Sequence, residues 1–183
     1  MQTLLRRLTL QCAGAVLVSA ALVPLATNEV AAQPPVPGLH AFIFDIPKDT
    51  QQLPDFRQLK PVGEIRGATL DVSPRSYASG FPGVTHRLEW YALQFDGPFT
   101  VAQAGDFTFR LECDDGARLF IDEQLVVDHD GIHPPSSKSG TIHLGAGGHS
   151  IQVQYFQGPK EQIALRVFAA QGGQAERIFS QRL

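Results

Sequence analysis

The feature that most constrains the fold is an alternation of apolar and polar side chains in the second half of the chain. Between Phe107 and Cys113, every second residue is apolar and the residues between them are polar. A period of two predicts a β-strand with one face in a core and the other in water. The alternation stops at residues 114–116 and at residues 122–123, and it resumes after each. Residues 107–130 therefore predict three strands joined by two acidic turns.

The rest of the chain repeats this pattern in short segments without helical periodicity. Two of its features are a possible break at Gly67 and the only tryptophan, Trp90, which we assign to a central strand and to the core. Many short strands separated by turn residues predict an all-β fold, an antiparallel β-sandwich or barrel. The further predicted strands are 39–46, two short strands within 62–72, 88–95, 99–101, 140–144, 151–156 and 162–168.

The amino-terminal segment has the pattern of a signal peptide. Arg6 and Arg7 precede a run of mostly apolar and small residues, and Val30-Ala31-Ala32 provides a cleavage site after Ala32. The alternative is a retained membrane anchor, but the apolar run is short and interrupted for a membrane span. We expect a secreted or periplasmic protein with no membrane contact after signal cleavage.

The chain is predicted to contain a signal peptide followed by a single domain. Residues 1–32 are the predicted signal peptide, and the proline-rich residues 33–38 are a lead-in. Residues 39–168 form the predicted β-barrel domain, and residues 169–183 are either a tail or an edge strand. A chain of this length can bury one core.

The charge distribution favours a cation over a nucleic acid as a partner. The chain has 15 basic and 18 acidic residues, a formal net charge of −3. No basic residues are clustered, so nucleic acid is not expected to bind. Eight of the acidic residues lie between Asp106 and Asp130, against only Arg110 and Arg118. This negative field would attract a cation.

No catalytic constellation is evident, so a non-catalytic protein is expected. The sequence has no nucleophile-elbow motif and no phosphate-binding glycine loop before a helix. Cys12 leaves with the predicted signal peptide, so Cys113 has no internal disulfide partner. Its place in the alternation predicts a buried core thiol rather than a nucleophile.

Two sets of residues could bind a metal ion, and each has a structural alternative. Asp114 and Asp115 offer hard oxygen ligands that suit Ca²⁺, or they belong to a tight turn in which Gly116 supplies a positive φ. His129 and His133, beside Asp128 and Asp130, could form a zinc-like set. Alternatively, the two aspartates are turn residues that bind their own backbone.

An ordered series of motifs resembles the protective-antigen-type β-barrel module, which is related to fungal flocculin and adhesin lectin domains. The resemblance spans about residues 39–168 and implies the same β-barrel fold. In those lectins an adjacent aspartate pair, joined by a cis peptide bond, holds a Ca²⁺ that ligates sugar hydroxyls. The motifs are Cys113-Asp-Asp-Gly-Ala-Arg-Leu-Phe-Ile-Asp122, Leu125-Val-Val-Asp128, His133, Lys138-Ser-Gly-Thr141, Gly148-His149 and Val153-Gln-Tyr-Phe156.

The resemblance implies that Asp114 and Asp115 are calcium ligands. The lectins supply further contacts, including an asparagine ligand, from a loop that corresponds to residues 157–162. Asn28 is the only asparagine here and lies in the predicted signal peptide. Gln157 or Glu161 would therefore have to replace the asparagine.

The expected function is calcium-assisted recognition of an extracellular or cell-wall glycan. Besides Gln157 and Glu161, the predicted ligand-binding residues are Asp130, His133 and Phe156. Tyr77 and Phe81 are further aromatic candidates, because sugars often contact aromatic rings. One alternative is a structural or protein-interaction module that binds an envelope protein without a metal. A second alternative is an accessory domain of a glycan-degrading system.

Overall fold

The computed structural model describes residues 38–183. The predicted signal peptide and residues 33–37 of the predicted lead-in lie outside the described residues. The described residues belong to one compact unit. Within residues 38–183, no helix is both long enough and apolar enough to span a membrane.

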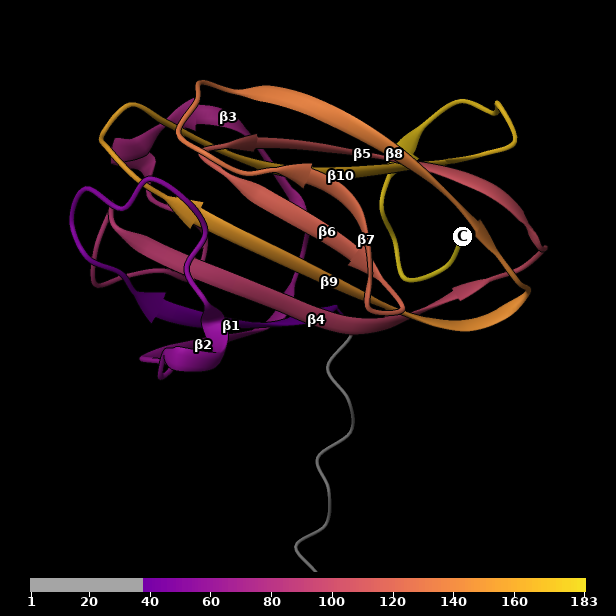
Figure 1. Cartoon of the computed structure of the whole chain (residues 1–183), viewed down its shortest axis with the longest axis horizontal. Helices are drawn as coiled ribbons and strands as arrows, with labels where there is room; N and C mark the ends of the chain where they lie inside the picture. The colour runs from indigo at the N-terminus through magenta and orange to yellow at the C-terminus, as the bar shows by residue number, and fades with distance from the viewer. Residues whose placement is uncertain (1–37) are drawn as a thin grey trace, which may run out of the picture. The chain divides into compact units, whose positions relative to one another are not determined.

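The protein is all-β, as the alternation predicts, and its strands form two antiparallel sheets (Figure 1). The first sheet has six strands in the order β2-β1-β4-β9-β6-β7. Their bounds are β1 (Leu39–Asp45), β2 (Gly63–Ala68), β4 (Tyr91–Val101), β6 (Ala117–Ile121), β7 (Gln124–His129) and β9 (Gly147–Gln157).

The second sheet has five strands. Four follow the order β11-β10-β5-β8, and β3 pairs with β10. Their bounds are β3 (Asp71–Ser76), β5 (Gly105–Asp114), β8 (Ser136–Leu144), β10 (Gln162–Gln171) and β11 (Arg177–Ile178). Two short 3₁₀ helices, η1 (Phe56–Gln58) and η2 (Tyr77–Ser79), lie in the connecting segments.

The apolar members of the alternating segments form the main core. Phe109, Leu111 and Cys113 of β5 are completely buried, which confirms that Cys113 is a core thiol. Val153 and Tyr155 of β9 belong to the same cluster. Because side chains alternate between the two faces of a strand, a period of two places one set in this core.

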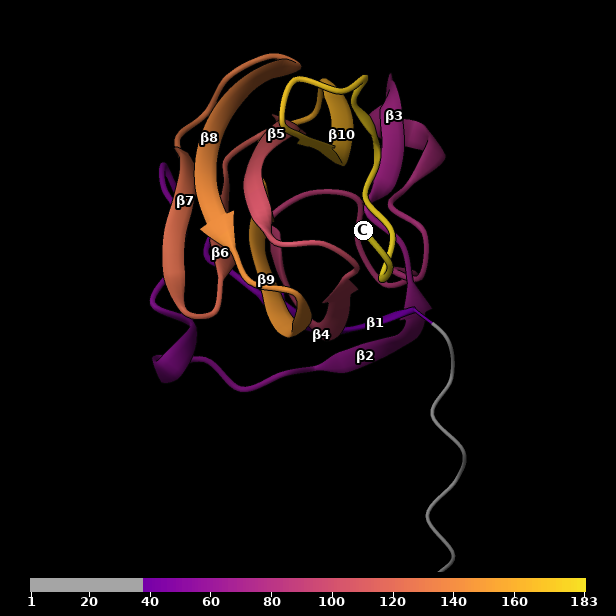
Figure 2. The same cartoon turned by 90° about the vertical axis from the view of Figure 1, so that its right-hand side faces the viewer.

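A close approach of β7 and β8 joins the two sheets along one edge. Figure 2 shows these strands side by side, although β7 belongs to the first sheet and β8 to the second. A Cβ atom at Gly140 would lie 2.0 Å from the carbonyl oxygen of Val126. Only glycine lets the two backbones come this close.

The two strands predicted at 88–95 and 99–101 are parts of one strand that begins later than predicted. Residues 91–101 form one continuous strand, β4, instead of two strands at 88–95 and 99–101. Trp90 precedes the strand, has a φ of 61° and is only partly buried. The prediction that Trp90 lies within a central strand is therefore wrong, because the backbone turns into the strand at this residue. Its side chain packs, partly buried, against a second core cluster that includes Phe44 and Phe156.

Three further segments differ from the predicted pattern or add to it. β2 continues through Gly67, which has a φ of 69°, and the chain breaks only after Ala68. The hairpin between β6 and β7 turns at Asp122 and Glu123, both with positive φ, as a two-residue hairpin requires. At the carboxyl end, β11 pairs with β10. The backbone N–H of Leu183 donates to the carbonyl oxygen of Thr100, and the carbonyl oxygen of Leu183 accepts from the backbone N–H of Ala102.

The approach of β7 and β8 predicts a strong effect of one methyl group. Gly140→Ala should lower the free energy of unfolding by about 1–3 kcal/mol, because the added Cβ collides with backbone atoms that cannot rotate away. Chemical denaturation measures the change. Gly148→Ala is the matched control, since a Cβ there meets nothing within 4 Å. Equal stabilities of the two variants would contradict the proposed role of Gly140.

Candidate functional site

The two adjacent aspartates lie where the chain leaves the second sheet for the first. Asp114 is the last residue of β5, and β6 begins at Ala117. Both aspartates are buried, with exposed fractions of 2% for Asp114 and 3% for Asp115. The peptide bond between them is cis, the configuration that the resemblance implies.

Gly116 is required for space and not for backbone conformation. It has no positive φ, so the prediction of a positive-φ turn glycine is wrong. A Cβ on Gly116 would lie 2.5 Å from Cε1 of Phe156 and 2.7 Å from the backbone nitrogen of Gly131. The turn is therefore packed between β9 and the segment that follows β7.

The loop after β9 contacts the aspartate pair directly. The backbone N–H of Gly158 donates a 2.7 Å hydrogen bond to Oδ2 of Asp115. Nε2 of Gln157 lies 3.4 Å from the same oxygen. The hydroxyl group of Tyr155 lies 2.6 Å from the backbone carbonyl oxygen of Asp114. Residues 155–158 thus hold both aspartates in place.

Neither aspartate carboxylate has a basic partner within ion-pairing distance among residues 38–183. Burial and the charge of Asp115 raise the pKa of Asp114 to about 7. Burial raises the pKa of Asp115 to about 6, although hydrogen bonds from the backbone of Gly158 and His133 oppose this. Two buried carboxyl groups with raised pKa values are a site at which a cation would be stabilised.

Gln157 and Glu161, which were predicted to replace the asparagine ligand, differ in burial. Gln157 is completely buried, and its Oε1 lies within hydrogen-bonding distance of the Tyr155 hydroxyl group. Its Nε2 donates to the carbonyl oxygen of Gln162 at 3.0 Å. Gln157 therefore lies inside the protein and not at its surface, where its amide group joins the loop to the core. Glu161 is exposed, and its negative charge raises the pKa of both aspartates.

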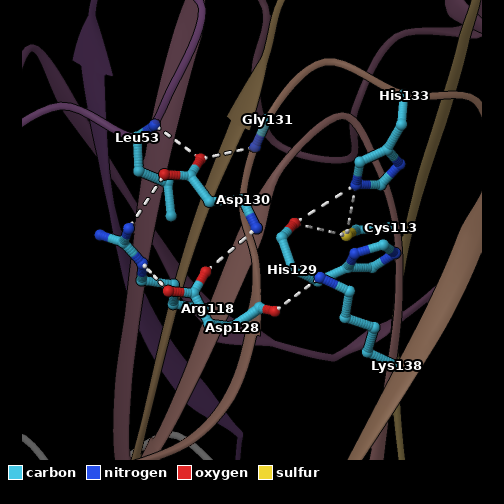
Figure 3. Close-up of polar contacts among 9 residues, drawn as sticks. All are labelled: Leu53, Cys113, Arg118, Asp128, His129, Asp130, Gly131, His133 and Lys138. Atoms are coloured by element: carbon cyan, nitrogen blue, oxygen red, sulfur yellow. Dashed lines mark hydrogen bonds and ion pairs between the residues drawn. The ribbon is translucent and has the colours of Figure 1, made fainter.

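Asp130 belongs to a neighbouring network that is already satisfied (Figure 3). Its Oδ1 accepts hydrogen bonds from the backbone N–H groups of Leu53 and Gly131, both at 2.8 Å. Its Oδ2 lies 3.1 Å from Nη2 of Arg118, which also pairs with Asp128. Asp130 thereby fixes the 46–62 segment to the end of β7, which is a structural role and not the predicted ligand contact.

His133 lies close to the aspartates and also to a second cluster. Its positive form would lower the pKa of both Asp114 and Asp115, and its backbone also contributes to lowering the pKa of Asp115. Its ring stacks on that of His129, with centroids 4.0 Å apart. Burial lowers the pKa of His129 to about 4 and raises the pKa of the Cys113 thiol.

Two of the three predicted aromatic contacts are buried and not available to a ligand. Phe156 is completely buried in a second core cluster, so its ring cannot stack on a sugar. Phe81 is also buried, and its ring packs 5.4 Å from that of Tyr155. Tyr77 is partly buried against the main core. The two phenylalanine predictions are therefore wrong, because both residues follow the packing habit of large apolar side chains.

Sequence reasoning missed Gly158, whose backbone supplies the short hydrogen bond to Asp115. The only signal for it is its place in Gln157-Gly158-Pro159, the turn after a strand, and a turn does not identify a partner 43 residues away.

Comparison with known proteins decides the family. The family model described as the PA14 domain matches residues 76–176, more than half of the chain and including both aspartates. The chain belongs to the PA14 domain family. As a PA14 domain it has the fold that the motif series implies, with the aspartate pair at the crossing between the two sheets.

Known structures and a curated relative support this assignment. The PA14 domain of the antifreeze protein MpAFP matches with a TM-score of 0.67 and 14% identity, covering 85% of this chain and 94% of that domain. The PA14 sugar-binding domain of an RTX adhesin matches with a TM-score of 0.63 and 20% identity, covering 80% and 96%. Identities this low establish similarity of fold alone.

Protein psiG of Dictyostelium discoideum is 32% identical over 92 residues, which are 50% of this chain. The chain spans 12% and 17% of the lengths of the curated relatives that it matches.

The raised pKa values predict how stability depends on pH without divalent cations. Folded Asp114 and Asp115 keep protons that the unfolded chain, with pKa values near 3.8, releases. Their contribution to stability is complete below pH 3.8 and is lost as pH rises through 6 and 7. The Asp114→Asn/Asp115→Asn variant cannot ionise there, so its melting temperature should rise relative to the wild type between pH 5 and pH 8.

Thermal denaturation in a chelator measures this difference. Asp71→Asn, at an exposed aspartate, is the control and should keep a constant difference from the wild type. A double variant whose difference from the wild type is the same at pH 5 and pH 8 would contradict the assigned pKa shifts.

Proposed function

We propose that this PA14 domain is an exported, non-catalytic carbohydrate-binding module in which Ca²⁺ at Asp114 and Asp115 contacts the sugar. The observation that carries the proposal is the pair of adjacent buried carboxylates without a basic partner among the described residues. A bound divalent cation would offset their mutual repulsion and the loss of solvation.

The donor set suits calcium better than a softer metal. Ca²⁺ takes six to eight oxygen ligands, typically carboxylates, carbonyls and water. Asp114 and Asp115 supply carboxylates, and the exposed Glu161 is a third carboxylate, whose negative charge raises the pKa of both. The amide oxygen of Gln157 faces Tyr155, so Glu161 takes the role of the missing asparagine. Ligand positions left open by the protein would be filled by water or by sugar hydroxyl groups.

Carbohydrate as the ligand class is supported by the family and by one of its solved members. The similar PA14 domain of the RTX adhesin is a sugar-binding domain by its description. The predicted signal peptide supports export to the compartment in which such glycans occur. The absence of a nucleophile motif supports a binding role instead of catalysis.

Calcium should raise the melting temperature in a concentration-dependent way, because it binds the folded state. The shift should be larger at pH 8 than at pH 5.5, since the ligand carboxyl groups must first lose their protons. Asp115→Asn should abolish the shift, whereas the Asp71→Asn control should retain it. A calcium response that survives in Asp115→Asn would place the ion elsewhere.

A glycan array with calcium and with a chelator tests the sugar. Wild-type protein should bind a subset of glycans in calcium only, and Asp115→Asn should bind none. Calcium binding without any glycan signal would remove carbohydrate from the proposal. If calcium also fails to bind, the alternative of an envelope protein-interaction module is favoured.

A further inference from the structure

A second donor cluster lies beside the aspartate pair and has different chemistry. It consists of Cys113 on β5, His129 at the end of β7 and His133 in the segment between β7 and β8. One ligand atom from each residue lies within 4.8 Å of the other two. Figure 3 shows both imidazole rings beside the sulfur atom, with Nε2 of His133 4.0 Å from Sγ.

Ser136 holds the outer edges of both rings. Its hydroxyl group lies 3.0 Å from Nε2 of His129 and 3.2 Å from Nδ1 of His133. Ser136 itself is the cross-strand neighbour of Cys113 in the pairing of β5 with β8. One hydroxyl group thus contacts one nitrogen of each ring. The second nitrogen of His133, Nε2, lies 4.0 Å from Sγ of Cys113 and 3.3 Å from the carbonyl oxygen of His129. Such outer partners orient histidine ligands in metal sites.

We propose that Cys113, His129 and His133 bind a d-block divalent cation, for which Zn²⁺ is the probe. One thiolate and two imidazole groups are a donor set for zinc, and a water molecule would complete a tetrahedral site. On binding, the sulfur–zinc bond forms and the thiol proton passes to solvent.

Binding requires one local rearrangement. The two rings are stacked with an interplanar angle of 20°, so their nitrogen lone pairs lie in two nearly parallel planes and do not converge on one point between the rings. His133 is the more exposed of the two histidines and lies outside the strands, so its ring can turn toward a shared ion. Cys113 and His129 lie in strands and keep their places.

The zinc site and the proposed calcium site are separate in chemistry. Zinc prefers the sulfur and nitrogen donors, whereas calcium prefers the carboxylates of Asp114 and Asp115. Zinc binding should therefore remain measurable in a variant of the aspartate pair, and calcium binding should remain measurable in a variant of the cysteine–histidine cluster. Failure of the calcium proposal would not remove the zinc proposal, and the reverse also holds.

Titration of the full folded protein with Co²⁺, a spectroscopic substitute for zinc, provides the test. One equivalent should produce a thiolate-to-cobalt charge-transfer band, and Zn²⁺ should remove that band by displacement. Cys113→Ser should lose the band, and His133→Ala should weaken cobalt and zinc binding by at least about tenfold. Asp115→Asn should retain the band.

Matched variants separate a built site from surface histidine binding. Ser136→Ala should weaken zinc binding by about 10–100-fold, as loss of an orienting partner does, whereas Ser137→Ala, at the next residue, should not. His143→Ala removes an exposed histidine outside the cluster and should leave binding unchanged. Circular dichroism confirms that each variant is folded. A wild-type protein without the charge-transfer band, or zinc affinity equal in wild type and His133→Ala, would overturn the proposal.

Discussion

The structure depends on how the chain crosses from one sheet to the other at Asp114-Asp115-Gly116. The crossing has no room for a side chain at Gly116, because Phe156 and the backbone of Gly131 occupy that space. The carbonyl oxygen of Gly116 accepts a 3.0 Å hydrogen bond from the backbone N–H of Phe156. The core of one sheet and the loops at its end are therefore locked to a turn that carries two carboxyl groups.

This arrangement explains why the carboxyl groups are buried. β5 places its alternating apolar residues in the core as far as Cys113, and the next two residues have to enter the space between β9 and the segment after β7. The protein contributes a short hydrogen bond from Gly158 to Asp115, but no basic side chain among residues 38–183 pairs with either group. Retention of a proton or capture of a cation are the two ways to neutralise such a pair. Competition between these two makes the proposed calcium site sensitive to pH.

The residues beside the aspartate pair differ in how firmly they are held by other parts of the protein. Asp130 binds Arg118 and two backbone N–H groups, so both oxygens of its carboxylate already have partners within the protein. His133 instead lies beside the Cys113 thiol on a segment outside the strands, and its charge would lower the pKa of both aspartates. The same end of the fold thus presents hard oxygen donors and, beside them, soft sulfur and nitrogen donors. Their chemistry, and not their distance from each other, separates the two proposed ions.

The alternation of apolar and polar residues was enough to predict the all-β class, most strand positions and the burial of Cys113, because a period of two follows from the geometry of each strand. The sequence also identified the aspartate pair, whose adjacency is a local property. The partners follow from the three-dimensional fold: Gln157 and Phe156 are buried, Asp130 pairs with Arg118, and Trp90 lies before β4 and packs against the second core cluster. These outcomes depend on contacts between segments far apart in the chain. A local pattern states which side of a strand is apolar, but it does not state which strand or loop will lie against it.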